Sequence, residues 1–261
     1  MSGVFSEFFQ SIRSPNPKQV FFKSLRSNRK LVFWYASRLV DRNSVIETVS
    51  QLQKIDQLRK EKTAITFICN HLTYADSHII ETLMIRNGFR DLAKHLIHIA
   101  GQKTYEMPRR WFTRSLNTIR VYQPKARVEK DFKRKMNSRA LRWAAHLKKR
   151  GYSLLVFPEG TRTRKHTRFN PFAANPKTTI YFRNSIVVPL GLMGAENIMP
   201  VGKILQSRST VRLRIGEPIQ HEQFSERLKS SESTEREMRS LQMQEYMMRI
   251  NALLDPEYKF S

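Results

Sequence analysis

The sequence has almost no cysteine, few acidic residues and no long apolar run. Cys69 is the single cysteine among 261 residues, which excludes an internal disulfide and a cysteine-rich metal cluster and favours a reducing compartment. No apolar run approaches the roughly 20 residues that a membrane-spanning helix needs. The N-terminus shows no signal-peptide pattern. We therefore expect a chain that stays in the cytoplasm and lies on the surface of any membrane that it contacts.

Acidic residues are scarce relative to basic ones. The chain has 22 Asp and Glu against 47 Lys and Arg, which gives a formal net charge of +25. A surplus of this size implies an anionic partner: nucleic acid, an acidic membrane surface or a phosphorylated substrate. The remaining composition is that of a globular protein, because 40% hydrophobic residues supply a core for one large domain or two small ones.

The first 54 residues predict a helical segment that precedes the main domain. Residues 1–17 end in SPNP, which is typical of a turn. Between residues 18 and 54, large apolar residues alternate with lysine and arginine, which favours one or two amphipathic helices. Two interpretations stay open. The helices pack on the core with a solvated basic side, or they lie at a membrane interface, where aromatic rings and cations meet the headgroups.

Strands and helices alternate from residue 64 onward. Short apolar runs rich in β-branched residues predict strands, and the segments between them have helical spacing. The expected strands are 64–69, 96–101, 118–122, 153–157, 186–193 and 210–216, and the clearest helices are 77–88 and 128–150. This alternation predicts an α/β fold with a mixed, largely parallel sheet flanked by helices. We expect this core to span residues 55–220 and a helical tail, 221–261, to pack on it.

The first expected strand ends in the sequence NHLTYAD, which contains His71 and Asp76. In parallel sheets, chemistry collects at the carboxyl ends of the strands. Across one turn, the carboxylate can orient the imidazole and stabilise its protonated form, as a general base requires. A structural histidine at a strand end is the alternative. A metal site with His78 as third ligand is another, although no second ligand cluster with suitable spacing occurs.

A second polar loop, VFPEGTRTRK, follows the strand at 153–157. Pro158 stops the strand and Gly160 permits a tight turn. Arg162, Arg164 and Lys165 crowd onto the loop, and paired arginines suit bidentate capture of a phosphate. A solvated basic loop is the alternative interpretation. Beside a His–Asp pair at the same sheet edge, the loop becomes a phosphate anchor next to a general base.

These two motifs resemble those of the glycerolipid acyltransferases that make lysophosphatidic and phosphatidic acid. NHLTYAD resembles the family's NHxxxxD block, and FPEGTRTR resembles its FPEGTR block. The resemblance extends from about residue 64 to 216. NTIRVYQP, from Asn117, lies where the family has its second block, and IVVPLGL, around Pro189, resembles the fourth.

The resemblance implies roles for individual residues. His71 would take the proton from an acceptor hydroxyl while Asp76 orients it, and no acyl-enzyme or cofactor would be required. Substrate binding would fall to Glu159, Gly160, Thr161, Arg162 and Arg164.

The second block departs from the family pattern. Gln123 occupies the position of the arginine usually expected there, so that Lys125 or Arg127 would supply the charge.

The expected function is transfer of a fatty acyl group from acyl-ACP or acyl-CoA to a phosphorylated glycerolipid, most directly 1-acyl-sn-glycerol 3-phosphate. Glycerol 3-phosphate or another lysolipid is the alternative acceptor. The expected location is peripheral, on the cytoplasmic inner face of an anionic membrane. A non-catalytic membrane-binding or nucleic-acid-binding protein is the alternative from another class, although no nucleic-acid-binding module is recognisable and no nucleic acid is expected as a partner.

Overall fold

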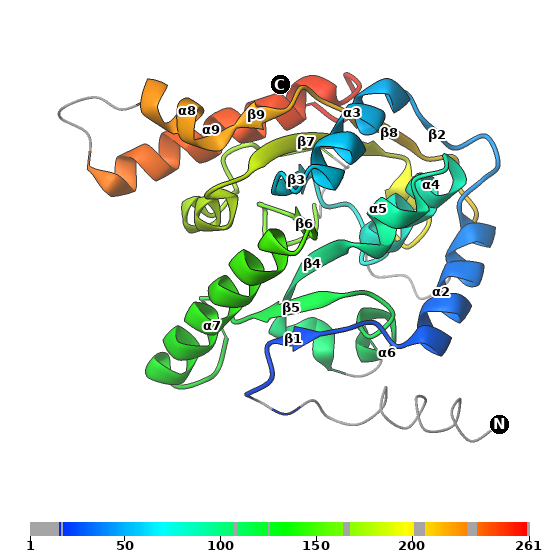
Figure 1. Cartoon of the computed structure of the whole chain (residues 1–261). Coiled ribbons are helices and arrows are strands. Elements are labelled where there is room, and N and C mark those ends of the chain that lie inside the picture. The colour runs from blue at the N-terminus through cyan, green and yellow to red at the C-terminus, as the bar shows by residue number, and fades with distance from the viewer. Residues whose placement is uncertain are drawn as a thin grey trace.

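A computed structural model of the chain describes residues 16, 18–106, 109–124, 126–163, 168–200, 207–228 and 234–259. Within these residues, nine strands form one sheet that lies between two groups of helices (Figure 1). The strands are β1 (Phe21–Phe22), β2 (Val45–Ile46), β3 (Ile65–Cys69), β4 (Leu96–Gly101), β5 (Thr118–Val121), β6 (Ser153–Val156), β7 (Ile186–Met193), β8 (Arg212–Ile215) and β9 (Ile219–Gln220). The six strands expected from the sequence are all present.

The helices connect and cover these strands. They are α2 (Arg26–Leu39), α3 (Val49–Lys60), α4 (Asp76–Arg86), α5 (Arg90–Lys94), α6 (Arg109–Thr113), α7 (Lys130–Lys149), α8 (His221–Arg227) and α9 (Glu235–Leu253). Short 3-10 helices add η1 (Gln102–Tyr105), η2 (Pro176–Phe182) and η3 (Ala195–Asn197). Positions of α4 and α7 agree with the expected helices to within a few residues.

The centre of the sheet is parallel. The strand order is β1-β5-β4-β6-β3-β7-β8-β2, with β9 paired to β7. Neighbours from β5 to β7 run parallel, whereas β1, β8 and β9 join antiparallel and β2 joins β8 in parallel. Every residue of β3 and β7 is buried, as expected of strands covered on both faces. The expected α/β fold with a largely parallel sheet is confirmed.

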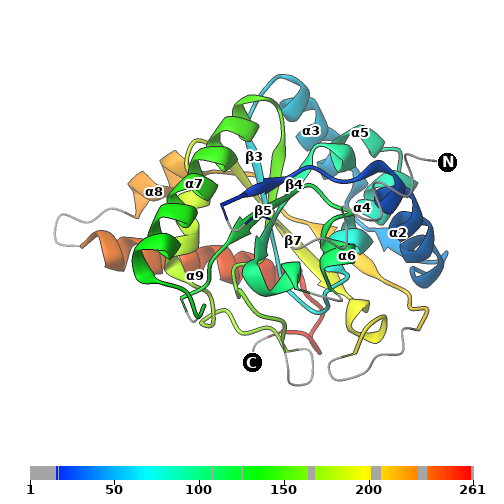
Figure 2. The same ribbon diagram turned by 90° about the horizontal axis from the view of Figure 1, so that it is seen from below.

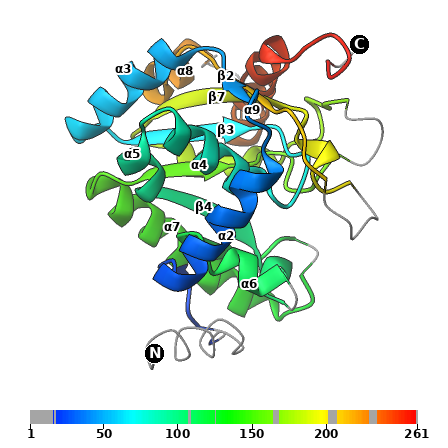
Figure 3. The same ribbon diagram turned by 90° about the vertical axis from the view of Figure 1, so that its right-hand side faces the viewer.

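The two groups of helices lie on opposite faces of the sheet. α4 and α5 connect β3 to β4, and α7 connects β5 to β6 in the opposite direction along the sheet order. Because such crossovers are right-handed, the two connections must cover different faces. Figures 1 and 2 show α2, α4 and α5 on one side and α7, α8 and α9 on the other, and Figure 3 shows α2 and α4 in front of the strands.

The N-terminal segment differs from the expectation of helices alone. α2 is helical, but β1 and β2 join the two ends of the sheet. Phe22 of β1 is buried against Tyr105, with ring centroids 4.8 Å apart, which places its side chain in the core. The expected boundary after residue 54 falls inside α3. Residues 1–15 and 17 lie outside the described residues, and membrane association of the segment stays a prediction.

The expected helical tail consists of α8 and α9. Thr234 caps α9, and its side chain and that of Glu237 complete a capping box. The buried side of α9 includes Met243, Tyr246 and Ile250.

In the part of the chain that the structure describes, no helix combines the length and apolar character needed to cross a membrane.

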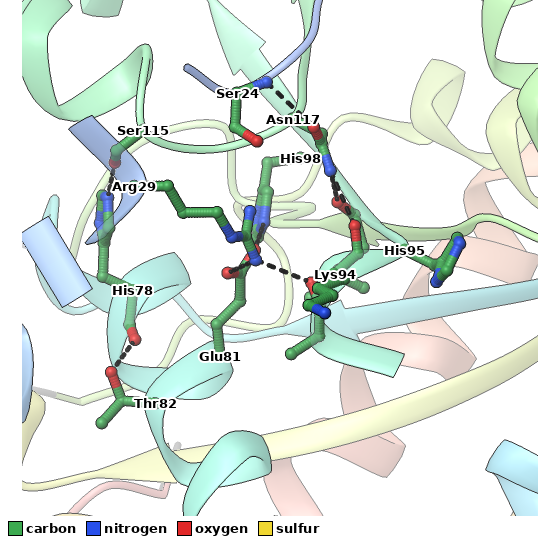
Figure 4. A network of polar contacts seen from close by, with 12 residues as sticks. Ser24, Arg29, His78, Glu81, Thr82, Lys94, His95, His98, Ser115 and Asn117 are labelled. Atoms are coloured by element: carbon green, nitrogen blue, oxygen red, sulfur yellow. Dashed lines mark hydrogen bonds and ion pairs between the residues drawn. The ribbon is translucent and has the colours of Figure 1, made fainter. Parts of the chain in front are cut away.

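A buried polar network joins α2, α4 and β4 (Figure 4). Glu81 of α4 has no exposed surface, and its two oxygens contact different partners. Oε2 accepts from Nη2 of Arg29 at 2.5 Å, and Oε1 lies 2.7 Å from Nε2 of His98. A buried carboxylate requires such partners. The network therefore fixes α4, whose first residue is Asp76, against the sheet.

Candidate active site

The first motif begins where β3 ends, and Asn70 continues the strand with its side chain. Asn70 Nδ2 donates to the carbonyl of Leu192 at 2.8 Å, and the Leu192 N–H donates to Asn70 Oδ1 at 2.8 Å. The amide group thus takes the place of a peptide beside β7. It secures the point where the chain leaves the sheet, directly before His71.

Asp76 is fully buried at the start of α4 and receives several hydrogen bonds. Its Oδ2 accepts from the backbone N–H groups of Leu72 at 2.7 Å and Thr73 at 3.0 Å, and Oδ1 accepts from Thr73 at 3.1 Å. The positive end of the α4 dipole also favours a negative charge there. Backbone donors therefore hold this carboxylate in one orientation.

His71 points its ring at that carboxylate. Its Nδ1 lies 2.8 Å from Oδ2 of Asp76, and its side chain is 17% exposed. An ionised carboxylate only accepts, so Nδ1 carries the proton and Nε2 offers a lone pair. The ring stacks on Phe157, with centroids 4.4 Å apart. The arrangement can hold a neutral imidazole whose free nitrogen accepts a proton from a bound hydroxyl.

The loop after β6 forms hydrogen bonds with both the backbone N–H and the carbonyl of His71. Glu159 Oε1 accepts from the His71 N–H at 2.8 Å, and Oε2 accepts from the Thr163 hydroxyl at 3.0 Å. The Thr163 N–H donates to the His71 carbonyl at 2.9 Å. Burial raises the pKa of Glu159 to about 7, although hydrogen bonds from His71 and Thr163 oppose that rise. Glu159 therefore braces the two motifs against each other.

Arg162 is held by an aromatic ring from the first motif. Its guanidinium carbon lies 3.7 Å from the ring centroid of Tyr74, a cation–π contact. Gly160 has φ +65°, a left-handed conformation that favours glycine. Thr161, between them, is exposed. The turn at Gly160 thus brings Arg162 to the loop that contains His71.

Gln123 occupies the position where the family usually has an arginine, and its side chain contacts the same loop. Its Nε2 donates to the carbonyl of Gly160 at 2.9 Å. Asn117, at the start of that block, is buried and donates to the carbonyl of Lys94 at 2.9 Å. Arg127 is exposed, whereas Lys125 falls outside the described residues, as do Arg164 and Lys165. Their expected roles in binding stay predictions.

His78 does not join His71 and Asp76. It is buried in the network of Figure 4, with Nε2 2.7 Å from the Ser115 hydroxyl. Burial, together with nearby His98, lowers the pKa of His78 to about 3. Among the described residues, no group of three or more His, Cys, Asp or Glu side chains is placed to hold a metal ion.

Cys69 is buried in β3 and is poorly suited to act as a nucleophile. Burial raises the pKa of its thiol well above the usual value, and the carboxylates of Asp76 and Glu159 raise it further. The reactive form of cysteine is the thiolate.

Sequence reasoning missed several residues that shape the site. Asn70 and Tyr74 lie inside the first motif, and Phe157 and Thr163 lie inside the second. Their place in the two motifs was the only signal in the sequence that could have identified them. Their contacts join segments up to 122 residues apart, which no local pattern reveals.

A family model described as "Acyltransferase" matches residues 48–193, more than half of the chain. The chain belongs to the acyltransferase family. The matched region contains the His71–Asp76 pair and the Glu159–Arg162 loop. Together with the relatives described next, this match confirms the resemblance to the glycerolipid acyltransferases.

Curated relatives from plants agree with this membership. The chain is 25% identical over 171 residues to the chloroplastic 1-acyl-sn-glycerol-3-phosphate acyltransferase BAT2 of Brassica napus. The aligned region covers 65% of this chain and 45% of the relative. It is 29% identical over 168 residues to the chloroplastic glycerol-3-phosphate acyltransferase ATS12 of Cucurbita moschata. This aligned region covers 62% of this chain and 34% of the relative. The chain thus spans less than half the length of these relatives.

A solved structure shares the fold of the present protein. It is the 1-acyl-sn-glycerophosphate acyltransferase PlsC from Thermotoga maritima, at 20% identity and a TM-score of 0.50. The match covers 95% of this chain and 89% of that chain. At this identity the similarity supports the arrangement of sheet and helices alone.

Proposed function

We propose that this protein transfers an acyl group from a thioester to a hydroxyl of a phosphorylated glycerolipid acceptor. The observation that carries the proposal is the contact between His71 Nδ1 and Asp76 Oδ2 at 2.8 Å, which leaves Nε2 directed away from the carboxylate. The acceptor hydroxyl gives its proton to Nε2, and its oxygen attacks the acyl carbon. The bond from that carbon to sulfur breaks, and the leaving thiolate takes the proton from the imidazolium.

Arg162 is the proposed ligand of the acceptor phosphate. Its contact with the Tyr74 ring orients the guanidinium beside the loop of His71. Guanidinium groups recognise phosphate through paired N–H donors. Glu159 positions the loop through His71 and Thr163, and the proposed contributions of Thr161, Arg164, Lys125 and Arg127 are secondary.

1-Acyl-sn-glycerol 3-phosphate is the acceptor that we propose first, because the name of the Brassica napus relative specifies it. Glycerol 3-phosphate is the second candidate. The name of the Cucurbita moschata relative specifies it, and Gln123 occupies the position of the expected arginine. The donor is proposed to be acyl-ACP or acyl-CoA.

The proposed location is peripheral, on the inner face of an anionic membrane. Leu31 and Trp34 of α2 are 52% and 54% exposed, and the Arg38 guanidinium lies 4.4 Å from the Trp34 ring centroid. Exposed apolar side chains beside cations suit the headgroup boundary.

A donor and acceptor panel tests the proposal. Purified protein is incubated with labelled palmitoyl-CoA or palmitoyl-ACP and with either acceptor, beside His71→Ala. We expect acyl transfer that falls at least about 1,000-fold in the variant. His95→Ala is a matched control, since His95 lies away from the site at the end of α5 and is not buried. Absence of product with every combination, or full activity in His71→Ala, would reject the proposal.

A further inference from the structure

Helix α7 carries a concentration of positive charge that the proposed chemistry does not use. Its sequence, KDFKRKMNSRALRWAAHLKK, contains eight Lys and Arg and a single acidic residue, Asp131. The apolar side of the helix is buried and packs toward the sheet through Met136, Ala140, Ala144 and Leu147. Apart from the buried Lys148, the basic side chains therefore lie on the solvent side of the helix or along its border.

These cations lack acidic partners within the described residues. Ion pairs elsewhere engage arginines such as Arg59, Arg212 and Arg214. None joins Arg134, Lys135, Arg139 or Arg142 of α7 to a carboxylate in the described part of the chain; the Arg142 guanidinium donates only to the Ser138 hydroxyl, at 3.0 Å. Like charges so close together repel one another. An anionic partner would relieve that repulsion.

The middle of this face is hollowed and contains an aromatic side chain. A shallow open hollow of about 310 Å³ is lined by Arg139, Arg142, Trp143 and His146. Trp143 is 38% exposed, and its ring stacks on Phe21 of β1 with centroids 5.3 Å apart. Tryptophan and arginine are the side chains that most often anchor protein interfaces. A rigidly supported Trp among cations is thus suited to a partner that presents both acid groups and an apolar contact.

The face starts beside the active-site loops. Lys133 Nζ donates to the carbonyl of Pro124 at 2.8 Å, next to Gln123, which donates to the Gly160 carbonyl. From Lys133 to Trp143 the helix extends by about 15 Å, at 1.5 Å per residue. A partner docked on the hollow therefore sits about 15 Å along α7, roughly half the helix length, from the end nearest the site. It can deliver a reactive group only on a long flexible arm.

The position of α7 favours a dissolved protein over a lipid surface. α7 and α2 lie on opposite faces of the sheet (Figures 1 and 2). A membrane that takes up Leu31 and Trp34 of α2 would leave α7 facing water. The α7 face also lacks a stripe of exposed apolar residues, which an interfacial helix buries among the lipids. Its 20 residues, about 30 Å of helix, make a footprint longer than a nucleotide occupies.

We propose that the solvent side of α7, centred on Arg139, Arg142 and Trp143, docks the acidic carrier protein that brings the acyl thioester. This inference rests on the proposed acyl transfer and assigns its donor. Opposite charges on the two proteins would steer encounter and set orientation. The thioester arm of the docked carrier would then run along the N-terminal part of α7 toward His71.

The test compares Arg139→Glu/Arg142→Glu with wild type on two donors that share one palmitoyl chain. We expect kcat/KM with palmitoyl-ACP to fall at least about tenfold, through KM, while kcat/KM with palmitoyl-CoA stays within about twofold. Arg42→Glu/Arg90→Glu is the matched control, because it changes the net charge equally at exposed sites outside α7. This control should leave both donors unaffected.

Direct binding separates this inference from the proposed function. Fluorescence anisotropy with labelled ACP that carries no acyl group measures docking without turnover, and Arg139→Glu/Arg142→Glu should weaken it at least about tenfold. If wild type transfers no acyl group but binds ACP through α7, acyl transfer fails and the docking face stands. Unchanged ACP binding, equal loss in the control pair, or a loss of anionic-vesicle binding without a loss of ACP binding would overturn the inference.

Discussion

Glu159 accepts a hydrogen bond from the backbone N–H of His71 at 2.8 Å, which joins the two motif loops through a partly buried carboxyl group. Because burial raises the pKa of Glu159 to about 7, the folded protein binds a proton there that the unfolded chain releases at an ordinary pKa near 4.3. At pH values between these two pKa values, the folded state therefore holds more protons than the unfolded state. By linkage, this group's contribution to stability falls as pH rises from about 4.5 to about 7.

Glu159→Gln should remove that pH dependence. The amide oxygen still accepts from the His71 N–H, and the amide N–H₂ can donate to the Thr163 hydroxyl. We expect the free energy of unfolding of wild type, relative to this variant, to decline between pH 5 and pH 7 in urea titrations. Glu222→Gln, at an exposed carboxylate, provides the control. A difference between wild type and Glu159→Gln that does not vary with pH would contradict the assignment.

Asp76→Asn should impair turnover more than acceptor binding. Oδ2 alone accepts from the imidazole and from the Leu72 and Thr73 N–H groups. An amide in this place offers either a neutral oxygen, which does not stabilise the imidazolium, or an N–H₂ group, which donates to the imidazole and reverses its tautomer. The imidazole then loses its orienting partner. We expect kcat to fall by roughly 100-fold or more with KM nearly unchanged. Asp91→Asn, at a carboxylate that is 61% exposed, should keep kcat, and a matched fall in both variants would argue against a specific role.

The part of this site that could be predicted is the part encoded locally. His71 and Asp76 are five residues apart across one turn, and the strands before both motifs have unmistakable apolar runs. β1 and β2 have only two residues each, so their pairing depends on distant edge strands and leaves no periodicity to detect. The Gln123–Gly160 and Asn70–Leu192 contacts likewise depend on the completed sheet. The catalytic pair and its loop could therefore be predicted from the local sequence, whereas the contacts between distant segments that support the site could not.

Glu81 should be essential for stability. Its carboxylate has no exposed surface and contacts both Arg29 and His98 (Figure 4). Glu81→Ala would leave the buried imidazole of His98 and the partly buried guanidinium of Arg29 without the carboxylate that they share. We expect a loss of about 3–5 kcal/mol in the free energy of unfolding, measured by urea denaturation. Glu61→Ala, at an exposed site, should change stability by less than about 0.5 kcal/mol, and a similarly small effect at Glu81 would refute the prediction.

Arg162 should determine the affinity for the acceptor phosphate. Removing a charged hydrogen-bond donor typically costs about 1.5–3 kcal/mol, so Arg162→Ala should raise the acceptor KM by roughly 10- to 100-fold. Arg162→Lys should recover part of the loss, because the charge returns without the paired donors. Steady-state kinetics at varied acceptor concentration measure both. Arg150→Ala, past the far end of α7, is the control, and an unchanged KM in Arg162→Ala would exclude phosphate binding by this residue.

Membrane contact through α2 is best tested with point substitutions, because deletion of residues 1–54 would remove β1, β2 and part of α3 from the sheet and so disturb the fold. Leu31→Ser/Trp34→Ser deletes two large side chains that are more than half exposed. Burial of such a side chain contributes about 1.5–3 kcal/mol, so the pair should weaken binding to anionic vesicles at least about tenfold in flotation. Leu241→Ser/Met248→Ser removes two side chains of α9, each 45% exposed, from the other face of the sheet. Equal loss in both pairs would mean that α2 is not the membrane-binding surface, whereas a loss confined to the α2 pair would assign membrane contact to the side opposite α7.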